Sequence, residues 1–138
     1  MYLFSLSDTK KSQSFITPWS FIHFYNGFLF SLFTLQFKIT SIKMNFIIYN
    51  IIHLLYECKD IYNAYISKKK KLVIFFGDSK NSLLNSLGDH LCSIFGWYCG
   101  YYYYLNNSQN TNYLKNSFKL MVLYMILIFL FCFFTIEF

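Results

Sequence analysis

Apolar residues gather in four long runs along the chain, and short polar segments separate these runs. They cover about residues 18–37, 39–57, 82–105 and 119–136. Each run comes close to the roughly 20 residues that a helix needs to cross a bilayer. The pattern therefore predicts an all-α fold, a polytopic transmembrane helix bundle whose four spans form a single membrane domain over residues 1–138.

The second run is less apolar than the other three. Lys43, Asn45, Asn50 and His53 interrupt it, although a lysine near the end of a span can extend its long side chain to the head groups. A bundle of three spans is the alternative, with this segment lying at the bilayer surface.

The composition agrees with a chain that lipid solvates. Hydrophobic residues make up 56% of the chain and charged residues 13%, about half the charged share that is usual in soluble domains. A soluble protein of this size needs more charge on its surface, so the lipid bilayer is the expected partner. The net charge is +6, and none of the basic residues is an arginine. Without arginine for bidentate contacts to bases, we predict no nucleic-acid partner.

Lysines indicate the orientation of the predicted bundle. The loop at residues 58–81 is the most basic segment, and with four spans one side of the membrane collects eight lysines and the other side four. The positive-inside rule then places this loop and both termini of a multi-pass integral membrane protein in the cytoplasm. We interpret Lys68, Lys69, Lys70 and Lys71 as an orientation signal, with binding of anionic lipid head groups as the alternative. The type of membrane and the oligomeric state stay open.

Polar and small residues inside the first three runs repeat at helical spacing. A lipid-exposed ionisable group costs roughly 2.5 to 3.5 kcal/mol even on the lenient insertion scale, so these groups are expected to face protein. At about 100° per residue they share one face on each helix. Besides ionisable groups, this polar intramembrane interface contains Asn26, Asn50, Asn85, Ser93, Gly96 and Gly100. The last two have the spacing that lets helix backbones approach closely.

Four ionisable residues on these faces are the candidates for catalysis: His23, His53, Glu57 and Asp89. If the three faces turn toward one another, the four side chains converge inside the bundle and can serve as acid, base or relay groups. His53 and Glu57 are also spaced i,i+4 for a simple hydrogen bond or ion pair. Two histidines and two carboxylates would suit zinc or manganese. The preferred interpretation is a polar interface with no bound metal and no cofactor.

Three short blocks carry a resemblance to a known family. They are His23 with Asn26-Gly27-Phe28-Leu29-Phe30, then Tyr56-Glu57, and then Asn81-Ser82-Leu83-Leu84-Asn85-Ser86-Leu87-Gly88-Asp89. In these blocks the chain resembles an uncharacterised family of bacterial multi-pass inner-membrane proteins with HGFLF-like and GDSxxNSxGD-like blocks. The resemblance covers the first three runs. It implies a multi-pass membrane location and no established reaction.

The sequence does not specify a biochemical activity. The leading hypothesis is a multi-pass integral membrane protein of unknown role whose polar interface holds its helices in register. The first alternative is an intramembrane, hydrolase-like enzyme that acts on a lipid or lipid-linked substrate with Glu57, Asp89 and a histidine. The second is a small transporter or proton-relay subunit, because histidine and aspartate inside a membrane can pass protons. Whether the chain is an enzyme stays open.

Overall fold

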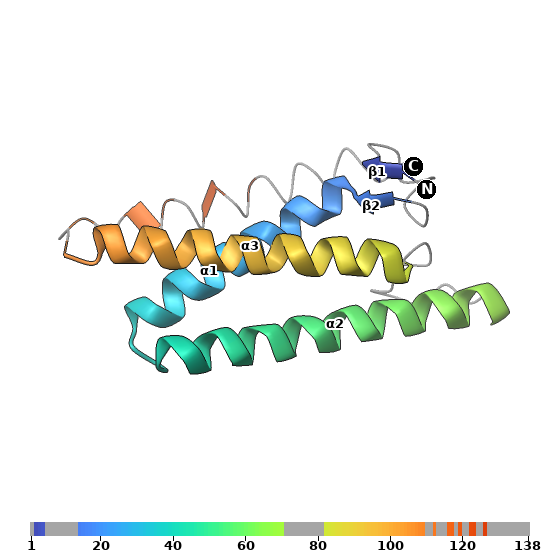
Figure 1. Ribbon diagram of the computed structural model, residues 1–138, viewed down its shortest axis with the longest axis horizontal. Coiled ribbons are helices and arrows are strands. Elements are labelled where there is room, and N and C mark those ends of the chain that lie inside the picture. Colours follow the sequence, from blue (N-terminus) through green and yellow to red (C-terminus); the bar gives the residue numbers. More distant parts are fainter. Residues whose placement is uncertain are drawn as a thin grey trace.

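The computed structural model describes residues 2–4, 14–70 and 82–109, together with residues 112, 116, 117, 119, 122, 123 and 126. Its elements are β1 (Tyr2–Phe4), β2 (Ser14–Ile16), α1 (Pro18–Gln36), α2 (Ile42–Lys70) and α3 (Leu83–Asn107). The two strands pair in parallel. α2 and α3 run along the long axis of the molecule, α1 crosses α3 obliquely, and the strands lie at one end (Figure 1).

Local sequence signals determine where α1 and α3 begin. Pro18 occupies the first position of α1, where its fixed φ suits a helix and no N–H is needed. Ser82 precedes α3, and its side-chain oxygen accepts a hydrogen bond from the backbone N–H of Asn85 at 3.2 Å. After α1 ends at Gln36, the chain turns at Lys38, which has a φ of 51°. This short turn lets α2 run back in the opposite direction to α1 (Figure 1).

Glycines bring the backbones of α1 and α3 into direct contact. A Cβ atom at Gly96 would clash with the carbonyl oxygen of Phe24, and one at Gly27 would clash with the carbonyl oxygen of Ser93. Gly100 meets α1 in the same way. Because glycine has no Cβ, it permits this close approach of two backbones. At these glycines the two helices therefore have almost no side-chain layer between them. Figure 1 shows where they cross.

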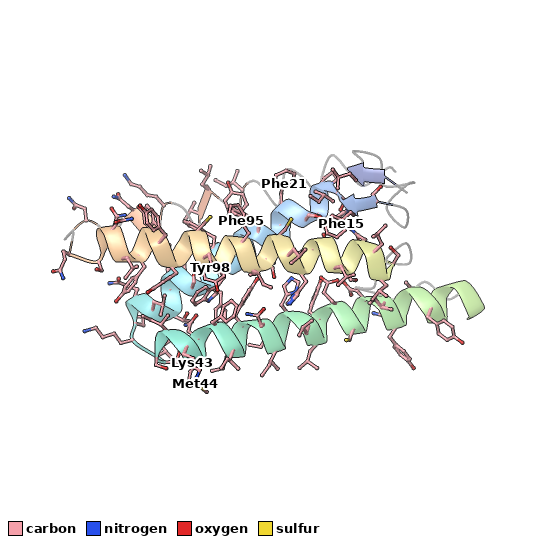
Figure 2. The ribbon with its side chains drawn as sticks, in the orientation of Figure 1. Phe15, Phe21, Lys43, Met44, Phe95 and Tyr98 are labelled. Carbon is pink, nitrogen blue, oxygen red and sulfur yellow. The ribbon has the colours of Figure 1, made fainter. Side chains whose placement is uncertain are left out.

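A buried asparagine connects α2 to the other two helices. The indole N–H of Trp97 on α3 donates a hydrogen bond to the side-chain oxygen of Asn45 at 2.8 Å, and both residues are buried. The amide nitrogen of Asn45 donates in turn to the hydroxyl of Thr34 on α1. Lys43 and Met44 lie on the outer side of α2 and point away from the other helices (Figure 2). One face of α2 is thus fixed against α1 and α3.

The helices lack the properties of membrane spans. Among the residues that the structure describes, no helix combines the length and the apolarity that a bilayer crossing requires. The prediction of a polytopic transmembrane bundle of four spans is therefore wrong, as are the multi-pass membrane location and the cytoplasmic termini derived from it. The physical reason lies in the polar faces, because histidine, asparagine and serine lower the mean hydropathy of each helix, and charged residues lower it further in α2 and α3. The same finding contradicts the membrane location that the family resemblance implies.

The second helix is longer than the sequence pattern predicts. α1 and α3 coincide closely with the runs at 18–37 and 82–105, but α2 continues through residues 58–70, for which the pattern predicts a basic loop. No glycine or proline interrupts α2, so the local sequence contains no helix-breaking residue at the end of the apolar run. The predicted fourth run, at 119–136, lies almost entirely outside the described residues.

Candidate metal centre

The space between the three helices holds ionisable side chains. Asp89 on α3 is 1% exposed, and Glu57 and His53 on α2 are 3% and 5% exposed. His23 on α1 completes the group, with a side chain that is 12% exposed. Burying an ionisable group is costly unless it has a partner, so these side chains need specific contacts. The structure brings all four of the candidate residues together.

Three atoms from α1 and α2 lie close enough to share a ligand. His23 Nδ1 is 2.9 Å from His53 Nε2 and 3.5 Å from Glu57 Oε1. His53 Nε2 is 3.8 Å from Glu57 Oε1. The helical repeat explains part of this arrangement, since His53 and Glu57 stand one turn apart on the same face of α2. We call these three atoms the donor triangle.

The donor triangle has the dimensions of a metal site. Zinc ligands at about 2.0 to 2.1 Å in tetrahedral geometry stand about 3.3 to 3.4 Å apart. The sides of the donor triangle, 2.9, 3.5 and 3.8 Å, bracket that spacing. Without a cation, the two ring nitrogens can approach this closely only if one of them carries a proton that the other accepts. The arrangement can therefore hold a shared proton or a metal ion.

Asp89 lies behind His23, on the side away from the donor triangle. His23 Nε2 is 3.6 Å from Asp89 Oδ2, and the Ser20 hydroxyl donates a hydrogen bond to Asp89 Oδ1. The same hydroxyl accepts a hydrogen bond from the backbone N–H of Thr17 at 3.0 Å, which ties Asp89 to the first turn of α1. A carboxylate behind a ligating histidine fixes its tautomer and makes its other nitrogen more basic. Asp89 is therefore placed to orient His23.

His90 on α3 is in the corresponding position behind His53. His90 Nδ1 is 3.2 Å from His53 Nδ1, and the ring centroids are 5.2 Å apart. If His53 Nδ1–H donates to His90, the lone pair of His53 Nε2 points into the donor triangle. His90 follows Asp89 directly in the sequence. One short segment of α3 therefore contacts both histidines of the donor triangle from behind.

Burial changes the acidity of several groups around the donor triangle. Burial, together with the positive charges that His23 and His90 can carry, lowers the pKa of His53 to about 3. Burial also lowers the pKa of His90. Burial has the opposite effect on the phenol of Tyr49, one turn before His53, and raises its pKa to about 12. At neutral pH His53 therefore keeps a lone pair for a proton or a metal ion.

The lowered pKa of His53 predicts how folding stability depends on pH. In the unfolded chain a histidine has a pKa of about 6.5, so below that pH the unfolded chain binds a proton that folded His53 does not. The stabilising contribution of His53 is fully present above about pH 6.5 and is lost as the pH falls toward 3. We expect the free energy of unfolding to fall by up to about 1.4 kcal/mol per pH unit over this range. Urea unfolding at several pH values, with a chelator present, measures it.

The His53→Asn variant is the control for this pH dependence. It keeps a polar side chain and removes the titrating group. The other groups that face this position, His23, His90, Glu57 and Asp89, remain in both proteins. In acid the stability of the variant should change less steeply with pH than that of the wild type. Equal slopes for the two proteins would contradict the prediction.

A cavity of about 530 Å³ lies beside the donor triangle, between α1 and α2. This volume falls in the range of about 300 to 1,000 Å³ that is usual for small-molecule sites. His23 and His53 form part of the cavity wall, so two of the three residues of the donor triangle face it. The rest of the wall is mostly apolar or aromatic: Trp19, Ile22, Asn26, Leu29, Phe30, Phe33, Thr34, Tyr49, Ile52 and Tyr56.

Most other residues of the predicted polar interface contribute to helix structure or helix packing and lie outside the candidate centre. Asn26 lines the cavity, whereas Asn50 donates a hydrogen bond to a carbonyl oxygen one turn earlier in its own helix at 2.8 Å. The hydroxyl of Ser93 likewise donates to a carbonyl oxygen of the preceding turn of α3 at 2.9 Å. Gly96 and Gly100 form the backbone contact with α1. Only Asn26 among these five residues adjoins the candidate centre through the cavity.

Asn85 and the lysine cluster complete the set of predicted residues. Asn85 is fully buried, and its carboxamide has no hydrogen-bond partner within the described part of the chain. Lys68, Lys69 and Lys70 belong to the last turn of α2, and Lys71 lies outside the described residues. The binding of anionic lipid head groups by these lysines stays a prediction.

Two residues of the centre, Tyr49 and His90, were missed by the sequence reasoning. Tyr49 stands four residues before His53, so the helical spacing could have identified it. His90 gives no periodic signal, because it lies about 100° around the helix from Asp89. Only the packing of α3 against α2 reveals its contact with His53.

The comparisons with known proteins give no assignment for the candidate centre. Comparison of the chain with protein-family models, with curated proteins and with solved structures gives no match. The resemblance to the bacterial inner-membrane family therefore stays a prediction. Any function has to be argued from the donor triangle and its surroundings.

Proposed function

We propose that the protein binds one divalent transition-metal ion, zinc by preference, through His23 Nδ1, His53 Nε2 and Glu57 Oε1. The observation that carries the proposal is the donor triangle, with its sides of 2.9, 3.5 and 3.8 Å. Two imidazole nitrogens and one carboxylate oxygen are donors that zinc accepts readily. This proposal replaces the preferred interpretation of the sequence, which was a polar interface without metal.

The groups behind the two histidines support metal binding. A ligating histidine almost always donates its second ring N–H to a carboxylate, a carbonyl oxygen or water. His23 has Asp89 on that side at 3.6 Å, and His53 has the ring nitrogen of His90 at 3.2 Å. A divalent ion would balance the negative charges that the buried side chains of Glu57 and Asp89 carry when they are ionised. Such neutralisation offsets the cost of burying them.

The number of ligands favours a catalytic centre over a structural one. Structural zinc sites are closed by four protein ligands, whereas catalytic sites use three and keep one position for water or substrate. Within the described part of the chain, the donor triangle supplies three ligands, and a cavity adjoins it. Zinc in such a site lowers the pKa of its bound water to about 7 and polarises a carbonyl group. The proposed function is therefore that of a zinc-dependent enzyme that hydrolyses a carbonyl-containing substrate.

Metal analysis of the purified protein tests this proposal. We expect each chain to retain one equivalent of zinc after loading and dialysis. With Co²⁺ in place of zinc, we expect the intense visible absorption of a four-coordinate ion. Acetohydroxamic acid should shift this absorption, because the position that is not filled by the protein is open to an oxygen donor.

Two results would contradict the proposal in different ways. If no stoichiometric metal is retained, the donor triangle shares a proton and only stabilises the packing of the helices. If Co²⁺ binds but acetohydroxamic acid leaves its spectrum unchanged, the ion is bound in a closed, structural site. The first result removes metal binding, and the second removes the catalytic class.

A further inference from the structure

We infer that the cavity between α1 and α2 binds the aliphatic chain of a neutral acyl compound, an ester or amide whose carbonyl group reaches the metal ion. The inference rests on the proposed function and names its substrate class. It is carried by one juxtaposition: the residues of the donor triangle form part of the wall of a cavity that is otherwise mostly apolar. A site with a polar end and apolar walls suits a molecule with a polar head and an apolar tail.

The length of the cavity suits an extended chain. His23 marks the donor triangle on α1, and Leu29 and Phe33 line the same cavity further along that helix. The rise from residue 23 to residue 33 of a helix is roughly 15 Å. An apolar wall of this length, formed by one side of a helix, can cover a linear aliphatic chain over most of its extent.

Most side chains along this length are apolar, with Asn26 and Thr34 as the polar ones. Leu29, Phe30 and Phe33 from α1 line the cavity together with Ile52 from α2. Among the described residues that line it, none is a lysine, an aspartate or a glutamate. Each methylene group that such walls bury raises affinity about fourfold. Affinity should therefore rise steeply with the length of the chain.

The charges at the donor-triangle end of the cavity favour a neutral head group. A divalent ion is balanced by the two carboxylates of Glu57 and Asp89, both of which are buried. An anionic head group would add a buried charge without a partner, which is costly. A neutral carbonyl group adds none. The ring of Tyr56 belongs to the same end of the cavity, 6.2 Å from His23, and carries a hydroxyl donor.

Calorimetric titration of the zinc-loaded protein tests the inference with two probes that share a head group. We expect octanamide to bind at least about 100-fold more tightly than acetamide, because only the longer probe places methylene groups in the cavity. The Leu29→Trp variant fills the apolar part of the cavity, so it should remove the preference for the longer chain without reducing zinc affinity.

A matched variant controls for the added indole. Leu54→Trp makes the same change at a position on α2 that is 47% exposed and is not among the residues lining the cavity, and it should leave both affinities unchanged. Should Leu29→Trp fail to fold, Ile52→Asn makes the half-exposed wall of the cavity polar and should weaken binding of the longer probe by at least about tenfold.

The outcomes separate this inference from the proposed function. Zinc binding with equal affinity for the two probes would overturn the acyl-chain site and leave the metal centre intact. A chain-length preference that both Leu29→Trp and Ile52→Asn retain would place the chain elsewhere and overturn the inference as well. Absence of zinc binding would overturn both.

Discussion

Replacing Glu57 by glutamine is expected to weaken zinc binding by more than about 100-fold while the helices stay folded. Glutamine keeps the size of the side chain, but it removes the negative charge that balances the ion. Changes to groups behind the ligands typically reduce metal affinity 10- to 100-fold, so the loss of a ligand should exceed that range. Competition with a chromophoric chelator measures the affinity, and circular dichroism reports on the helices.

Asp89 and Asp60 provide the matched comparisons for this result. Asp89→Asn should reduce zinc affinity about 10- to 100-fold, since Asp89 lies behind His23 and not in the donor triangle. Asp60→Asn makes the same change of charge three residues further along α2, where the carboxylate is 2.9 Å from the ammonium group of Lys59, and it should leave zinc affinity unchanged. If Glu57→Gln and Asp60→Asn bind zinc equally well, Glu57 is not a ligand.

The helix faces on which the candidate residues lie could be predicted, because residues spaced by one helical turn share a face in any helix that contains them. His53 and Glu57 are four residues apart, so any helix through them places both on one face. The inward direction of that face also follows from physical chemistry, since buried ionisable groups need partners. The spacing of Gly96 and Gly100 indicates a close helix contact for a similar reason, and in the structure these glycines meet the backbone of α1.

The donor triangle itself could not be predicted from periodicity. Whether His23 Nδ1 lies 2.9 Å from His53 Nε2, or a few ångströms further away, depends on how α1 and α2 are placed relative to each other and on both side-chain rotamers. Neither quantity is encoded in the spacing of residues along one helix. The choice between a metal site and a polar interface without metal depends on that distance.

The membrane prediction failed because it relied on the length of the apolar runs and not on the mean hydropathy of each helix. The large apolar side chains that suggested spans include Phe21, Leu55 and Phe95, which are 57%, 66% and 64% exposed in the structure. The polar residues on the opposite faces lower the mean hydropathy of the same helices, and no described helix meets the requirements of a span. The polar faces that mark the candidate centre are thus also the features that argue against the spans.

Adding one methyl group at Gly96 is expected to destabilise the fold by about 2 to 3 kcal/mol, although alanine is the better helix former by about 1 kcal/mol. The new Cβ would clash with the carbonyl oxygen of Phe24, so α1 and α3 must separate along their crossing. His23 would then move away from Asp89, and zinc affinity should fall together with the free energy of unfolding. Leu91→Ala, at a position of α3 that is 55% exposed, should change stability by no more than about 0.5 kcal/mol. Urea unfolding of the wild type, Gly96→Ala and Leu91→Ala measures these changes. If Gly96→Ala is more stable than the wild type, helix propensity outweighs the backbone contact. The two helices are then not in contact at this glycine.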